Sequence, residues 1–175
     1  MKKSDFRTAI SLLVFACTLG ILLGGYQLYT KYGMVNPVEK QLKARPTIAG
    51  VEMSKKDGQY QITLQLHEVE NLQSEYLAIQ EILDKNLKPG GYELIIRDPD
   101  NYALQEAYLY LQPAIYEAAA TNRYVWLDET VSRYALDAGI NYRLYVDDRY
   151  IYLQLAEGGN SLYRVIQVKS GQNIT

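Results

Sequence analysis

The sequence of 175 residues has a single cysteine, Cys17, and a single histidine, His67. Because Cys17 lies inside an apolar segment, the rest of the chain has no thiol and cannot be a scaffold held by disulfides. His67 stands beside Glu68 and Glu70, with no second histidine or thiol nearby to complete the ligand set of a metal. We therefore expect no metal site and no cofactor, and interpret His67 as a solvent-exposed strand residue.

The sequence also lacks the glycine and serine motifs of common enzymes. It contains no Gly-x-Ser-x-Gly, no Gly-x-Gly-x-x-Gly and no phosphate-binding loop. Two acidic pairs, Asp98/Asp100 and Asp147/Asp148, have the chemistry of a hydrolase or a divalent-cation site. The first pair is equally typical of a helix start and the second of a hairpin turn. We expect no catalytic residues, and an enzyme that uses these acids, such as a wall hydrolase, is the third-ranked hypothesis.

Positive charge is scarce outside the first 45 residues. Residues 1–45 hold seven basic and two acidic side chains, whereas the remaining residues hold eleven basic and eighteen acidic ones. An acidic body repels phosphate backbones, so we expect no nucleic-acid partner. The early basic residues flank an apolar segment, where they suit anionic lipid headgroups.

That apolar segment, residues 9–30, is uncharged over 22 residues. This length is sufficient for a helix to cross a bilayer, and Tyr26 and Tyr29 would lie at its far interface. The apolar run is longer than the core of a signal peptide, and the bulky Phe15 before Cys17 does not suit a lipoprotein signal, which is the alternative. We predict an uncleaved transmembrane helix over residues 9–30, with the lipid bilayer as its partner.

The orientation of this helix is not decided by counting charges. Three basic residues precede it and four follow within residues 31–45. Because short basic N-terminal tails usually stay in the cytoplasm, we expect a single-pass cell-membrane protein with its N-terminus inside and its domain outside. The predicted parts are a basic tail at 1–8, the transmembrane helix at 9–30, a juxtamembrane tether at 31–50, an α+β domain at 51–170 and a frayed tail at 171–175.

The first half of the domain shows a strand–helix–strand pattern. Apolar and polar residues alternate over 60–66, which predicts a strand with one buried face. Asn71 is a suitable N-cap for a helix over 72–87, whose apolar stripe consists of Leu72, Tyr76, Ile79, Leu83 and Leu87. Residues 92–97 (YELIIR) resemble an interior strand. The short links predict a parallel β-α-β unit.

Helical character then continues to about residue 138. We expect it to begin at residues 98–100 (Asp-Pro-Asp), to be kinked or restarted at Pro113, to break again at 121–122 and to be capped by Gly139. Its first apolar stripe consists of Leu104, Ala107, Tyr108, Leu111, Ile115 and Ala118.

The last part of the domain is predicted to be an antiparallel meander. Strand-like segments cover 141–146, 149–156 and 162–169, and the links at 147–148 and 157–160 suit hairpins. The predicted order is β-α-β-α-(α)-β-β-β. This is an α+β fold with one mixed sheet, in which a parallel β-α-β unit precedes the meander and the helices lie mainly on one face.

Tyrosine is the unusual feature of the composition. There are seventeen tyrosines against two phenylalanines, neither of them in the domain. Five tyrosines fall in the meander and are the predicted interaction surface: Tyr142, Tyr145, Tyr150, Tyr152 and Tyr163. Two alternatives stay open, namely that tyrosine replaces phenylalanine in and around the core, or that these rings line a ligand groove.

These features favour a membrane-anchored, non-enzymatic protein-interaction or assembly module at the bacterial cell envelope, acting on a protein partner or by self-association. At fold level, an anchor followed by a small β-α-β-containing domain resembles the assembly modules of bacterial envelope machines, although such folds host many functions. The alternative is a membrane-tethered sensor or ligand-binding domain with a tyrosine-lined groove.

Overall fold

The computed structural model describes residues 14–22, 36–97 and 100–168. Residues 14–22 are helical. The elements that follow are α2 (Asn36–Lys43), β1 (Ile48–Lys56), β2 (Gln59–Leu66), α3 (Leu72–Asn86), β3 (Tyr92–Ile96), α4 (Tyr102–Thr121), α5 (Tyr124–Ala138), β4 (Asn141–Val146), β5 (Tyr150–Glu157) and β6 (Asn160–Gln167).

Most of the predicted membrane segment, residues 9–30, lies outside the described residues, as do the predicted tails at 1–8 and 171–175. Among the described residues, no helix is both long and apolar enough to cross a bilayer.

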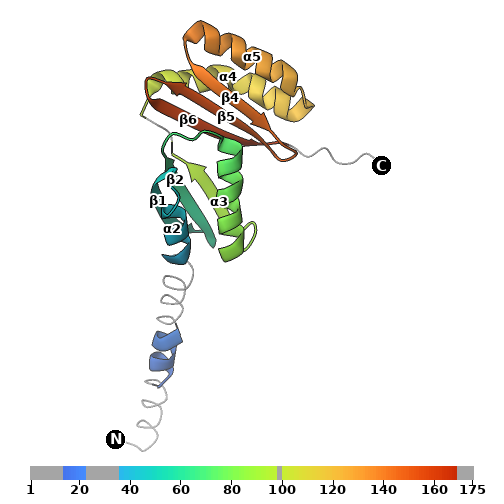
Figure 1. Ribbon diagram of the computed structural model, residues 1–175. Helices are drawn as coiled ribbons and strands as arrows, with labels where there is room; N and C mark the ends of the chain where they lie inside the picture. The colour runs from blue at the N-terminus through green and yellow to red at the C-terminus, as the bar shows by residue number, and fades with distance from the viewer. Residues whose placement is uncertain (1–13, 23–35, 98–99, 169–175) are drawn as a thin grey trace, which may run out of the picture.

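The first of two sheets, here the N-terminal sheet, has the strand order β1-β2-β3. β2 pairs antiparallel with β1 and parallel with β3, so the β2-α3-β3 segment is the predicted parallel β-α-β unit. α2 and α3 lie against one face of this sheet (Figure 1). The buried residues of this layer are Val38, Leu42, Ile48, Ile62, Leu64, Ile79, Leu83 and Leu87. The opposite face is polar, with an ion pair between Arg97 and Glu52 at 2.6 Å.

Residues 36–50 differ from the predicted tether. They form α2 and the start of β1, and Val38 and Leu42 are fully buried. The folded part therefore already includes residue 36. The sequence pattern of β1 is weak, because only Val51 and Met53 alternate with polar residues before the strand ends in Lys55 and Lys56. Val51 and Met53 face inward and are half-buried.

The second sheet, here the C-terminal sheet, has the order β4-β5-β6, and both pairs are antiparallel. This confirms the predicted meander. α4 and α5 cover one of its faces (Figure 1). The turn between β5 and β6 is made by Gly158 and Gly159 with φ angles of 57° and 79°, which glycine adopts without steric cost.

The prediction of one mixed sheet was wrong, because the strands form two separate sheets. β3 pairs only with β2 within the described chain, and β4 pairs only with β5. β3 is consequently an edge strand and not an interior one. Its apolar character comes from packing instead, since Leu94 and Ile96 contact the cluster formed by the C-terminal sheet and α3.

α4 also begins later than predicted. Its N-cap is Asn101, whose side chain accepts a hydrogen bond from the Leu104 N–H at 3.0 Å, while residues 98 and 99 lie outside the described chain. A kink or a restart was predicted at Pro113, and the restart is absent, because α4 is continuous through this residue. Pro113 and Leu109 are both exposed, so the Leu109 carbonyl that loses its helical partner can be solvated. The break at 121–122 and the cap at Gly139 are confirmed.

The two sheets are joined through the connector, residues 67–71, which links β2 to α3. Gln154 of β5 donates to the Val69 carbonyl at 2.8 Å and accepts from the Leu72 N–H at 2.9 Å. The Tyr163 hydroxyl of β6 accepts from the Val69 N–H at 2.9 Å and donates to the His67 carbonyl at 3.1 Å. Gln154, Val69 and Leu72 are all buried, so these bonds replace water at the backbone groups of Val69 and Leu72.

Replacing Gln154 with leucine should lower the free energy of unfolding by about 2 kcal/mol, because two buried backbone groups lose their partners. Urea denaturation followed by fluorescence of Trp126, the only tryptophan, measures this change. Gln65→Leu, at an exposed position on the polar face of the N-terminal sheet, is the control and should change stability by less than about 0.5 kcal/mol. Equal effects of the two substitutions would contradict the role given to Gln154.

Candidate functional site

The five tyrosines of the meander do not form one stripe. Because Tyr145 pairs with Tyr152, and Tyr163 with Gln154, these residues and Tyr150 point to the same face of the C-terminal sheet. Tyr142 pairs with Leu155 and points to the other face, where it packs against the core beneath α4 and α5. The structure thus brings four of the five predicted residues together.

The shared face of these four tyrosines is covered from within the chain. Tyr76 of α3 meets Tyr150 and Tyr152 edge to face, with ring centroids 5.5 and 5.8 Å apart. Tyr152 is 0% exposed and Tyr163 is 4% exposed. Tyr145 and Tyr150 are half-buried. Tyr152 and Tyr163 therefore have almost no surface left for another molecule.

The buried tyrosine hydroxyls have specific partners, as a polar group in a core requires. Tyr152 donates to Asp147 at 2.7 Å, and the other Asp147 oxygen accepts from the N–H groups of Arg149 and Tyr150, both at 2.8 Å. Burial, followed by the bond to Asp147, raises the pKa of Tyr152. Partial burial of Asp147 opposes its ionisation, but the hydrogen bonds from Arg149, Tyr152 and Tyr150 together lower its pKa.

These bonds give Asp147 a structural role in the β4–β5 turn, whereas Asp148 is exposed. Of the other acidic pair, Asp98 lies outside the described residues. Asp100 is exposed and lines a hollow of about 340 Å³ together with His67, Glu68 and Arg97. Within the described chain, no group of three or more histidine, cysteine or acidic side chains is placed to hold a metal ion.

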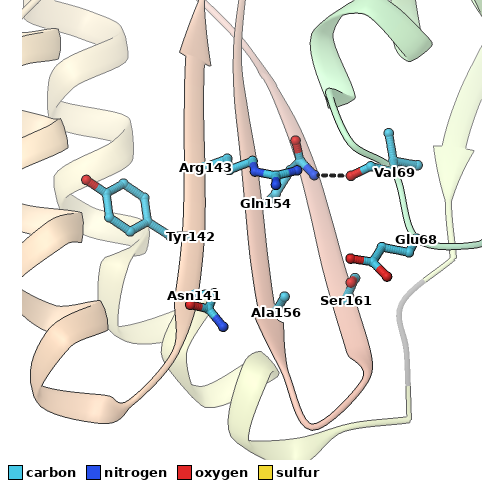
Figure 2. A pocket seen from close by; sticks show the side chains of 8 residues that line it. All are labelled: Glu68, Val69, Asn141, Tyr142, Arg143, Gln154, Ala156 and Ser161. Atoms are coloured by element: carbon cyan, nitrogen blue, oxygen red, sulfur yellow. Dashed lines mark hydrogen bonds between the residues drawn. The ribbon is translucent and has the colours of Figure 1, made fainter.

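A second hollow, of about 290 Å³, lies where the connector passes over the C-terminal sheet (Figure 2). Figure 2 shows Glu68 and Val69 of the connector on one side and Arg143 and Ser161 of the strands on the other. The Tyr142 ring points away from it toward the helices. Arg143 donates to the Glu70 carbonyl, so the wall carrying this cation is tied to the connector. The hollow is therefore lined by one acidic and one basic side chain, Glu68 and Arg143, and no tyrosine ring faces into it.

A different surface emerges on α4 and α5. Among the described residues from 36 to 168, all the exposed large hydrophobic side chains belong to these two helices: Tyr102, Leu109, Tyr110, Tyr116, Val125 and Leu136. Their exposed fractions run from 54% at Tyr116 to 83% at Leu136. Such a concentration is unusual, since exposed hydrophobic residues are normally scattered.

On α4 the exposed residues form an ordered row, here the outer stripe of α4. It follows alternating intervals of four and three residues, and consists of Tyr102, Glu106, Leu109, Pro113, Tyr116 and Ala120. Residues at this spacing lie along one side of a helix, and here that side is opposite the buried Leu104, Leu111 and Ile115. α4 therefore has apolar residues on both its inner and its outer side.

Sequence reasoning found only the inner stripe of α4. A usable signal was present, however, because α4 has no basic residue and only two acidic ones in its 20 residues. A helix that covers a sheet usually has a charged outer face, and α4 does not. The Tyr110 ring stacks on Tyr134 of α5 with centroids 4.6 Å apart, which fixes the edge of this surface.

An ion pair links the end of α2 to the start of α3. Arg45, just after α2, donates two bonds to Glu75 in the first turn of α3, at 2.7 and 2.8 Å, and Thr47 donates a third at 2.6 Å. The hydrogen bonds from Arg45 are the largest influence and, despite burial, hold the pKa of Glu75 below its usual value. Glu75 also lies near a helix N-terminus, where a negative charge is favoured.

Comparison with known proteins adds no relative: no protein-family model matches the chain, and no curated protein sequence shows a significant match.

Substituting Glu75 with glutamine should lower the free energy of unfolding at pH 7 by about 2 kcal/mol, through loss of the charged bonds to Arg45 and Thr47. A lowered folded-state pKa means that this contribution is present above the ordinary value of 4.5 and is lost as the pH falls through the lowered value. The difference between the two proteins should therefore shrink in acid. Urea midpoints measured between neutral and acid pH test this.

The control is Glu81→Gln, which removes an exposed pair with Lys85 on the same helix. It should leave the midpoint at neutral pH unchanged. A stability gap between Glu75→Gln and the unmodified chain that stayed constant with pH would refute the assignment.

Proposed function

We propose that the chain is a membrane-anchored, non-enzymatic interaction module at the bacterial cell envelope, and that its partner binds the outer stripe of α4. The observation that carries this proposal is the concentration of exposed large hydrophobic side chains on α4 and α5. Apolar surface of this kind gains free energy when a partner removes it from water.

The other surfaces support this choice by contrast. The face of the C-terminal sheet with four tyrosines is occupied by α3 and the connector. The open face of the N-terminal sheet carries ordinary surface pairs, such as Arg97 with Glu52 and Gln61 with Glu93. Neither resembles the outer stripe of α4, where the exposed residue between Leu109 and Tyr116 is the apolar Pro113.

The spacing of the outer stripe suits a helical partner. Alternating steps of three and four residues are the pattern by which one helix receives the side chains of another. The only charges on α4 are Glu106 and Glu117, and Glu117 is paired with Arg123 at 2.9 Å. Glu106 is therefore the acid of α4 that a basic flank of a partner helix would complement. A second copy of α4 would bring only further acids.

The placement of α4 agrees with an anchored module. Figure 1 shows α4 and α5 at the end of the domain opposite α2, and α2 is the element nearest in sequence to the predicted membrane segment at 9–30. In this proposal the anchor keeps the domain at the membrane on its extracytoplasmic side, and the outer stripe of α4 faces away from the bilayer.

A photo-crosslinking amino acid placed at Leu109 or Tyr116 in the full chain should yield a protein adduct in the cells that make it. The same group at Ser54, an exposed residue of β1 far from α4, is the control and should not give that adduct. A crosslinker at position 110, which is exposed next to the outer stripe, should give the same adduct, and the double variant Leu109→Gln/Tyr116→Gln should lose it. This variant should keep its urea midpoint, since both side chains are exposed. Absence of any protein neighbour at 109 and 116 would end the proposal.

Membrane topology is tested separately by a reporter fused after Thr175 that is active on only one side of the membrane. A signal from the extracytoplasmic side is expected. A cytoplasmic signal would reverse the orientation and point to soluble cytoplasmic partners.

A further inference from the structure

The hollow of about 290 Å³ beside the connector lies over a row of short side chains on the C-terminal sheet. Ala156 of β5 pairs with Asn141 of β4 on one side and with Ser161 of β6 on the other. This row is next to the row in which Gln154 binds the connector, and both rows point to the same face of the sheet. Because Ala156 and Ser161 are short, a space remains between the sheet and the connector where Glu68 lies.

The hollow carries two opposite charges that do not pair with each other. Glu68 lies on the connector and Arg143 on β4, and Figure 2 shows their side chains extending toward each other from opposite sides. Within the described chain, neither side chain takes part in an ion pair. Arg143 binds the Glu70 carbonyl through Nη1, and its other N–H groups have no hydrogen bond to the described residues.

The neighbouring charged side chains lie outside this hollow. Three titratable side chains line the adjoining hollow, of about 340 Å³, and not this one: His67, Arg97 and Asp100. Glu68 borders both hollows, but Arg97 is already paired with Glu52 at 2.6 Å. Glu70 is exposed and lines neither hollow. The walls of the smaller hollow therefore carry one negative charge, on the connector, and one positive charge, on β4.

The remaining lining residues set the size and polarity of a ligand. The Asn141 amide and the Ser161 hydroxyl have no hydrogen bond within the described chain, so both are available to a polar group. Gln154 is committed to the connector at both ends of its amide, while Val69 and Ala156 supply apolar surface. The volume is slightly below the roughly 300 Å³ at which pockets for drug-sized ligands begin, so the hollow suits a smaller molecule.

We propose that this hollow binds a small α-amino acid in its zwitterionic form. The Arg143 guanidinium donates to the carboxylate, because its planar N–H groups match the two carboxylate oxygens. The Glu68 carboxylate accepts from the ammonium group. A molecule that carries both charges close together satisfies both walls at once, whereas a simple anion or cation leaves one wall unpaired.

This site is separate from the surface of the proposed function and does not depend on it. It lies on the face of the C-terminal sheet opposite α4 and α5, since Tyr142, next to Arg143, points to those helices. A bound amino acid connects β4 to the connector. Because it binds the folded chain and not the unfolded one, it stabilises the contact between the two sheets.

Isothermal titration calorimetry of the full chain in detergent micelles tests the site, with glycine, alanine and serine as the probes. Alanine should give a saturable heat. Alaninamide lacks the carboxylate and N-acetylalanine lacks the ammonium group, and each should bind at least about tenfold more weakly, the factor expected for one charge-assisted hydrogen bond. Absence of heat from all three amino acids would overturn the proposal, as would equal binding of alanine and either matched control.

Variants assign the binding to the two walls. Glu68→Gln should weaken alanine binding by about tenfold or more. Arg143→Gln should do the same, and its urea midpoint is measured alongside because it also loses the bond to the Glu70 carbonyl. Glu70→Gln removes an acid of the connector that does not line the hollow, and should bind alanine as the unmodified chain does. Undiminished binding by Glu68→Gln, or an equal loss in Glu70→Gln, would contradict the assignment.

These results can be told apart from those of the proposed function. The variant Leu109→Gln/Tyr116→Gln, which changes the outer stripe of α4, should bind alanine with unchanged affinity. Loss of alanine binding in this variant would contradict a site on the opposite face of the sheet. Normal alanine binding together with no protein adduct at positions 109 and 116 would end the proposed function and leave this site standing.

Discussion

The structure depends on the hydrogen bonds that two side chains of the C-terminal sheet make to the connector between β2 and α3. Gln154 satisfies the backbone at Val69 and Leu72, and Tyr163 satisfies it at His67 and Val69. The same connector carries the N-cap of α3, because the Asn71 side chain accepts from the Ser74 N–H. Sheet, connector and helix are therefore fixed together by a few short polar contacts in a buried place.

α3 then determines how the rest of the domain is arranged. Leu72 and Tyr76, in its first half, pack against the C-terminal sheet, while Ile79 and Leu83 pack against the N-terminal sheet. The Arg45–Glu75 pair ties α2 to the same helix. α4 and α5 cover the face of the C-terminal sheet opposite α3, at the end of the domain away from α2 (Figure 1).

Local patterns in the sequence predicted most of the elements but not their assembly. The meander was predicted from strand-like segments with hairpin links between them, and α3 from helical spacing; both are local properties of the sequence. The stripe of α3 gave no sign that its first residues and its last ones meet different sheets. β1 was missed because its alternation of apolar and polar residues is short and ends in Lys55 and Lys56, and α2 was missed because it has only eight residues. The burial of Tyr152 and Tyr163 also depends on a partner far away in the sequence, which no local pattern encodes.

The distance along the chain between the two partners of the connector has a consequence for synthesis. Val69 and Tyr163 are separated by 94 residues. At roughly 5–20 residues per second, translation supplies Tyr163 about 5–20 s after Val69. During that interval the connector has no partner from the C-terminal sheet, and the apolar side of α3 that this sheet will cover is open to other chains. The contacts of Tyr163 with the connector can therefore form only after the last hairpin of the protein has been made.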